Sequence, residues 1–91
     1  MEKAYLIKVS GRVTGVGFRY AALLEAGKYP ALKGYVGNVG YGQVEALLQG
    51  EEEEVGMMID WLKVGPRFAR VDNIVVEVVA LDEKLRKFDI G

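Results

Sequence analysis

Hydrophobic and polar positions alternate at the start of the chain, with Tyr5, Ile7 and Val9 on one side of the pattern. A period of two residues is typical of a β-strand with one buried face. The segment Gly11–Gly17 interrupts the alternation with three glycines, which predicts a loop. Apolar residues then return at the spacing of a helix that ends at Pro30, since proline cannot continue a helix. The apolar positions of this helix are Phe18, Ala22, Ala26 and Tyr29.

The second half of the chain predicts three more strands and one more helix. Lys33–Val39 and Val44–Leu48 form a hairpin around the turn Gly40–Gly42. Glu51–Glu54 suit a helix N-terminus, because carboxylates there oppose the helix macrodipole, and Gly65-Pro66 supplies the end of that helix. The apolar stripe of the helix is Val55, Met58, Ile59 and Leu62. The apolar face of the next strand is Ile74, Val76, Val78 and Ala80, and Phe88–Ile90 adds a short edge strand.

The resulting order, βαββαβ, predicts an α+β ferredoxin-like two-layer sandwich. Two split β-α-β units with right-handed crossovers give an antiparallel sheet with both helices on one face. The 91 residues are enough for one compact domain, which we expect to span residues 1–91. This fold hosts metal carriers, RNA binders and enzymes, so the function has to be argued from a site.

The composition excludes several classes of function. The chain has no His and no Cys, which argues against thiol catalysis, Ser-His triads, disulfides and the usual zinc sites. A net charge of −1 argues against general binding to nucleic acid or to an anionic membrane. Met1–Gly11 resembles neither a signal peptide nor a membrane span, so we expect a cytoplasmic domain.

The charge is unevenly distributed, and the first half of the chain is the place to look for an anion site. Residues 1–40 hold six basic and two acidic side chains, whereas residues 41–91 hold six basic and eleven acidic ones. The loop Gly11–Gly17 runs into a helix, whose first N–H groups have no intrahelical acceptor and can converge on an anion. Arg19 could add its guanidinium fork. The spacing fits equally well a loop that only turns a corner, with Arg19 in a surface salt bridge.

Two known phosphate motifs do not fit this loop. No Gly-Lys-Ser/Thr follows the glycines, as a P-loop would require. Gly15-Val16-Gly17 also lacks the third glycine of a dinucleotide fingerprint.

The chain does resemble the acylphosphatase family. Gly11–Arg19 (GRVTGVGFR) is similar to the first signature of that family, G-x-V-Q-G-V-x-F-R. Gly34–Asn38 (GYVGN) resembles the start of the second signature. The resemblance covers essentially the whole chain, and its further matches are Gly42, Val44, Gly50, parts of Trp61–Val71, and Phe88–Ile90.

The resemblance implies hydrolysis of acyl phosphates to a carboxylate and phosphate, with no metal and no cofactor. In the family, the residue at the position of Arg19 binds the phosphate and the residue at the position of Asn38 orients the attacking water. The main-chain N–H groups of the cradle would hold the phosphoryl oxygens. The residues of this cradle are Gly15, Val16, Gly17, Phe18 and Arg19. The expected partners are a small acyl phosphate and competing phosphate or sulfate, and the expected state is a monomer.

Three departures from the family pattern raise the question of reduced activity or altered loop rigidity. Thr14 stands where the family usually has Gln, and Gly37 where it usually has a long side chain. The segment Tyr29–Leu32 is one residue longer than usual.

Asn38 also fits a purely structural role, since it precedes a glycine-rich turn, where Asn is common for its backbone conformation alone.

Two other functions stay open at this point. One alternative is a non-catalytic acylphosphatase-like domain, as in hydrogenase-maturation carbamoyl-transfer proteins. The other is an RNA-binding module of the same fold. Lys33-Gly34-Tyr35 begins like its RNP1 motif, but Val36 and Gly37 break the pattern and the predicted strand is the wrong one.

Overall fold

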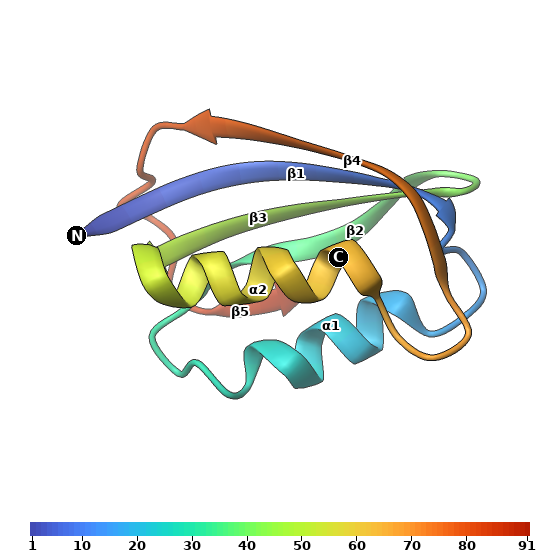
Figure 1. The fold of residues 1–91 in the computed structure, drawn as a ribbon. Coiled ribbons are helices and arrows are strands. Elements are labelled where there is room, and N and C mark those ends of the chain that lie inside the picture. The colour runs from blue at the N-terminus through green and yellow to red at the C-terminus, as the bar shows by residue number, and fades with distance from the viewer.

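The computed structural model describes residues 1–91 and shows the expected order of elements (Figure 1). Two helices cover one face of a five-stranded sheet, which confirms the α+β ferredoxin-like fold class. Neither helix combines the length and apolarity needed to cross a bilayer. The elements are β1 (Glu2–Arg12), α1 (Phe18–Ala26), β2 (Lys33–Gly40), β3 (Gln43–Glu51), α2 (Glu52–Val64), β4 (Arg70–Val79) and β5 (Phe88–Ile90).

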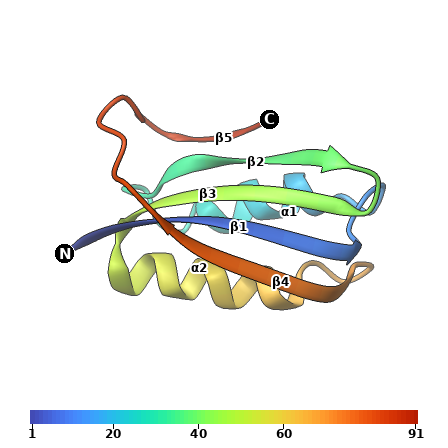
Figure 2. The same ribbon diagram turned by 90° about the horizontal axis from the view of Figure 1, so that it is seen from above.

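The sheet has the strand order β4-β1-β3-β2-β5, and its four long strands pair antiparallel. The short edge strand β5 runs parallel to β2, with Phe88 opposite Gly34, so the expectation of a wholly antiparallel sheet was wrong at this edge. The reason lies in where β4 ends. Val79 pairs with Ala4 at the end of the sheet where β2 begins, and the chain crosses to the outer side of β2 at that end (Figure 2). β5 therefore starts beside the first residues of β2 and runs in the same direction.

The crossing segment 80–87 is held in place by a buried side chain of β3. Gln49 is only 5% exposed. Its Oε1 accepts a hydrogen bond of 2.8 Å from the N–H of Asp82, and its Nε2 donates one of 3.1 Å to the Asp82 carbonyl oxygen. A buried amide has to be satisfied in this way, so Gln49 determines where the chain crosses the sheet.

The core lies between the helices and the sheet, on the faces that the hydrophobic pattern predicts. Ile7 and Val9 of β1 are fully buried, and Tyr5 packs partly against the same cluster. The buried cluster comprises Ile7, Val9, Val13, Phe18, Ala22, Ala26, Leu32, Val36, Val44, Ala46, Leu48, Val55, Met58 and Leu62.

The first helix is shorter than predicted. α1 ends at Ala26 rather than at Tyr29, and Gly27 follows as its C-cap. Glycine is unfavourable in a helix interior, and beyond it the chain forms a tighter turn, in which the N–H of Tyr29 donates to the Ala26 carbonyl oxygen at 2.9 Å. Tyr29 still packs partly against the core.

β4 departs most from its predicted burial. Ile74, Val76 and Val78 share the face that β1 presents to the helices, but Val76 is 42% and Val78 is 71% exposed. Ala80 lies beyond the end of the strand. β4 is an edge strand, and α2 lies mainly over β1 and β3, so nothing covers the outer half of β4.

Candidate active site

The loop between β1 and α1, residues 13–17, has the backbone of an anion cradle. Gly15 and Gly17 have φ angles of +75° and +74°, in the left-handed region that favours glycine. Nothing lies within 4 Å of the place where a Cβ would stand on either glycine. The main-chain N–H groups of residues 13–17 donate no hydrogen bond inside the protein, and the N-cap, Gly17, has no side chain to occupy the first turn of α1. These N–H groups are therefore free to bind a ligand.

Thr14 ties this loop to the turn between β2 and β3. Its Oγ1 accepts a hydrogen bond of 2.8 Å from the N–H of Gly42, and the N–H of Gly11 donates to the Gly42 carbonyl oxygen at 3.1 Å. Figures 1 and 2 show this loop, the β2–β3 turn and the connection from α2 to β4 at the same end of the molecule. The Thr14 departure thus has a structural role: a short hydroxyl side chain anchors the loop to the neighbouring turn.

Arg19 lies in the first turn of α1 and is oriented by the last residue of the chain. Its Nη1 donates a hydrogen bond of 2.6 Å to the main-chain oxygen of Gly91. The N–H of Gly91 in turn donates to the Val36 carbonyl oxygen at 2.7 Å. A Cβ on Gly37 would stand 3.7 Å from the Cα of Gly91, an ordinary van der Waals contact, so Gly91 lies against β2 directly beside position 37. The sequence had given no indication of this role for Gly91.

Asn38 lies next to this contact, near the end of β2. It is two residues beyond buried Val36 and opposite Val44, so its side chain lies on the face of the sheet that α1 covers. The residue is exposed, and its amide makes no hydrogen bond within the protein. Arg19 and Asn38, predicted from separate motifs, are thus brought to the same side of the sheet, with Gly91 and Gly37 linking them.

The position of Arg19 is set by the core beneath it. Phe18, the preceding residue, is 1% exposed, and its ring centre is 5.7 Å from that of Trp61 in α2. A Cβ on Gly65, the residue that ends α2, would stand 2.8 Å from the Phe18 ring. Gly65 is therefore needed for close packing as well as for ending its helix, a second role that the sequence alone did not indicate.

The electrostatics of the site favour an anion. Arg19 makes no ion pair with an Asp or Glu side chain, and its one hydrogen bond within the protein goes to the main-chain oxygen of Gly91. No three Asp or Glu side chains come together in the arrangement that a metal ion requires. The groups at this end of the molecule are one guanidinium, one amide and a set of main-chain N–H donors.

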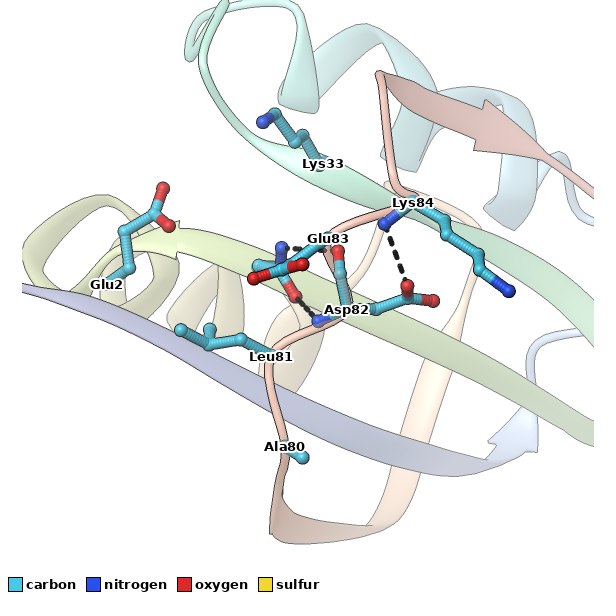
Figure 3. Close-up of a pocket in the computed structure, with 8 residues that line it drawn as sticks. Glu2, Lys33, Ala80, Leu81, Asp82, Glu83 and Lys84 are labelled. Atoms are coloured by element: carbon cyan, nitrogen blue, oxygen red, sulfur yellow. Dashed lines mark hydrogen bonds between the residues drawn. The ribbon is translucent and has the colours of Figure 1, made fainter.

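The largest depression of the molecule lies elsewhere. It has a volume of about 810 Å³ and lies where the crossing segment 80–84 meets the start of β1 and β2 (Figure 3). Glu2, Lys33 and Asp82 are among its lining residues, and none of the predicted site residues is. We place the candidate site at the cradle and not at this depression, because an anion is bound by N–H donors and a guanidinium, whatever the volume of the depression.

Known proteins resemble this chain over nearly its whole length. The family model described as Acylphosphatase matches residues 5–90. The chain belongs to the acylphosphatase family. The acylphosphatase of Paraburkholderia xenovorans strain LB400 is 38% identical over 87 residues, which are 96% of this chain and 89% of the relative. The crystal structure of the acylphosphatase from Bacillus subtilis matches with a TM-score of 0.90 and 38% identity, covering 100% of this chain and 99% of that one.

Similarity also extends to one part of a larger protein. The crystal structure of T. kodakarensis HypF matches with a TM-score of 0.84 and 34% identity, covering 98% of this chain but 12% of HypF. The matches with the acylphosphatases span most of their length, whereas the match with HypF is confined to a small part of it. Family membership makes this chain an enzyme that hydrolyses acyl phosphates.

Proposed function

We propose that the chain hydrolyses acyl phosphates by direct attack of water on a phosphoryl group held by Arg19 and by the cradle, without a metal or a cofactor. The water oxygen forms a bond to phosphorus while the bond from phosphorus to the acyl oxygen breaks. The carboxylate leaves with the electron pair of that bond, and the proton of the water passes to a phosphoryl oxygen of the substrate. A carboxylate is a good leaving group, so the protein has to supply neither a nucleophile nor an acid.

Arg19 and the cradle bind the phosphoryl oxygens in this mechanism. A guanidinium has five N–H donors, so the hydrogen bond to Gly91 leaves other donors for the substrate and holds the fork in one orientation. The N–H groups from Gly15 to Arg19 add neutral donors that need no reorganisation as charge shifts in the transition state. The observation that carries the proposal is this combination: unpaired N–H donors beside an arginine that pairs with no Asp or Glu side chain.

Asn38 orients the attacking water. Its amide is exposed and has no partner within the protein, and it lies on the α1 side of the sheet beside the Arg19–Gly91 contact. The amide oxygen can accept a hydrogen bond from a water and so hold that water in line with the leaving group. All of these groups come from one chain, so a monomer is sufficient for catalysis. Inorganic phosphate and sulfate resemble the bound group and should compete for the site.

The test is release of inorganic phosphate from acetyl phosphate and benzoyl phosphate by the purified chain. We expect saturable release from both substrates, since the site recognises the phosphoryl group that they share. Stabilisation by phosphate with no release from either substrate would instead support a binding module. Absence of both effects would contradict the site as well as the reaction.

A further inference from the structure

The outer edge of β4 is a long apolar strand with no neighbour. β4 pairs with β1 on one side only, so every second residue points its main-chain N–H and C=O groups away from the sheet. Both faces of the strand near this edge are apolar and uncovered, since Val75 on the open face is 52% exposed and Val76 and Val78 on the helix face are 42% and 71% exposed.

This edge lacks the features that usually prevent pairing with another chain. Edge strands are commonly short or carry lysine, proline or a bulge. The opposite edge of this sheet follows that rule, because β5 has only 3 residues. Residues 73–79 of β4 contain no lysine, no proline and no glycine, and Glu77 is their only charge. The single irregularity of β4 lies near its start, opposite Ser10 and Gly11.

The sequence at this edge is complementary to itself. In an antiparallel pair of β4 strands related by a two-fold axis at Val75, Ile74 lies opposite Val76 of the second copy and Asn73 lies opposite Glu77 of the second copy. Aliphatic β-branched residues then face one another at the centre, and an amide donor faces a carboxylate on either side of it. Farther from the axis, Asp72 lies opposite Val78 of the second copy. A two-fold axis at Val76 would instead place the Glu77 carboxylate opposite Val75, and one at Ile74 would place Asn73 opposite Val75.

We infer that two copies of this chain associate through β4, antiparallel and centred on Val75, to form one continuous ten-stranded sheet. The axis is perpendicular to the sheet, so both pairs of helices lie on the same side. The β1 strands of the two copies are then three strand spacings apart, roughly 14 Å. α2 lies mainly over β1 and β3, and helices in contact are about 8–10 Å apart, so the two α2 helices fit without collision. The association leaves the catalytic site free, because β1 and β3 separate β4 from β2, the strand of Asn38.

Single-cysteine variants test the register, since the chain has no cysteine of its own. In Val75→Cys the two thiols meet across the axis with Cβ atoms about 5 Å apart, close to the separation that a disulfide needs. In Val78→Cys, which is more exposed, the two thiols lie roughly 20 Å apart along the strands. In a glutathione redox buffer we expect Val75→Cys to form a covalent dimer at least about tenfold faster than Val78→Cys. Equal rates for the two variants would overturn the register.

Sedimentation equilibrium of the unmodified chain, at concentrations up to about 1 mM, tests the association itself. We expect a reversible dimer that Val76→Lys abolishes and that Val39→Lys, a change of a somewhat more exposed valine on β2, leaves intact. Circular dichroism spectra and thermal melting show whether each variant is folded. A chain that stays monomeric over the whole concentration range would overturn the proposal, and any partner of this edge would then be a strand of another protein.

Discussion

Arg19 and Gly91, 72 residues apart in the sequence, are joined by a hydrogen bond of 2.6 Å between the guanidinium Nη1 and the main-chain oxygen. The partner is a main-chain oxygen that β5 holds beside β2, and not a carboxylate on a flexible side chain. The guanidinium is therefore oriented before any substrate binds. Such pre-organisation lowers the cost of binding a phosphoryl group in the geometry of the transition state.

Replacing Arg19 with alanine should abolish measurable turnover of acetyl phosphate while the fold is retained. Loss of one pre-organised donor typically costs on the order of 10²-fold in kcat, and this donor also carries charge. Arg19→Lys should restore little of the activity, because a point charge cannot contact both Gly91 and two phosphoryl oxygens. Arg86→Ala, at an exposed arginine of the crossing segment, is the matched control and should behave as the unmodified chain. Near-normal turnover by folded Arg19→Ala would contradict the assignment.

Asn38→Ala should lose turnover and keep phosphate binding, since Asn38 is proposed to contact the water and not the phosphoryl group. Binding to the native state alone stabilises a protein by about 2.7 kcal/mol at a hundredfold excess of ligand over Kd. Melting curves with and without phosphate should therefore show the same shift for Asn38→Ala as for the unmodified chain, and no shift for Arg19→Ala. Loss of the phosphate-induced shift in both variants would contradict the separate roles proposed for Asn38 and Arg19. Asn73→Ala is a control at the only other asparagine.

Gly17→Ala should damage the cradle, whereas Gly56→Ala should be harmless. Gly17 has a φ of +74°, and a side chain in that region costs about 1–2 kcal/mol or forces the loop to move. We expect loss of stability together with a large fall in kcat/KM. Gly56 lies inside α2 with open space around its Cβ position, so alanine there should raise the free energy of unfolding by up to about 1 kcal/mol. Urea unfolding and steady-state kinetics measure both effects, and unchanged kinetics in Gly17→Ala would show that the cradle is not used.

Activity should survive exhaustive treatment with a chelator. The proposed mechanism assigns all recognition of the phosphoryl group to Arg19 and main-chain N–H groups, so it has no step that a metal ion would assist. The measurement is turnover of acetyl phosphate after dialysis against EDTA. Loss of activity that magnesium or zinc restores would show that the reaction type is wrong.

The stability of the protein should fall in strongly alkaline solution through Tyr35 on the open face of the sheet. Its hydroxyl donates a hydrogen bond of 2.6 Å to Glu45 Oε2. That bond, followed by burial and by the charge of Glu45, raises the pKa of Tyr35 from 10.0 to about 12. The folded state thus holds the proton more tightly than the unfolded chain, so this contribution is complete below pH 10.0 and is lost as the pH rises to about 12. Urea unfolding across this range should show a smaller decline for Tyr35→Phe than for the unmodified chain, and an equal decline would contradict the role of this pair.

The sequence by itself determined most of the helices and strands, and it singled out the candidate residues of the site. Alternation and helical spacing located the strands and helices because local periodicity directly reflects which side of an element is buried. The glycines of the cradle and Arg19 were recognisable because the backbone angles and the charge that they supply are properties of those residues themselves. The predicted end of α1 was about one turn too late. Whether the helix ends at Gly27 or continues to Tyr29 depends on packing as well as on the spacing of apolar residues.

Only the tertiary structure decided which of these residues meet. The contact of Arg19 with Gly91 depends on where β5 lies, and that depends in turn on the crossing that buried Gln49 holds. No local pattern encodes such a contact, because its partners are far apart in the chain and one of them has no side chain. The same holds for β4. Its alternating valines predict one buried face, but burial depends on a covering neighbour, and the order of strands in the sheet leaves this one at the edge.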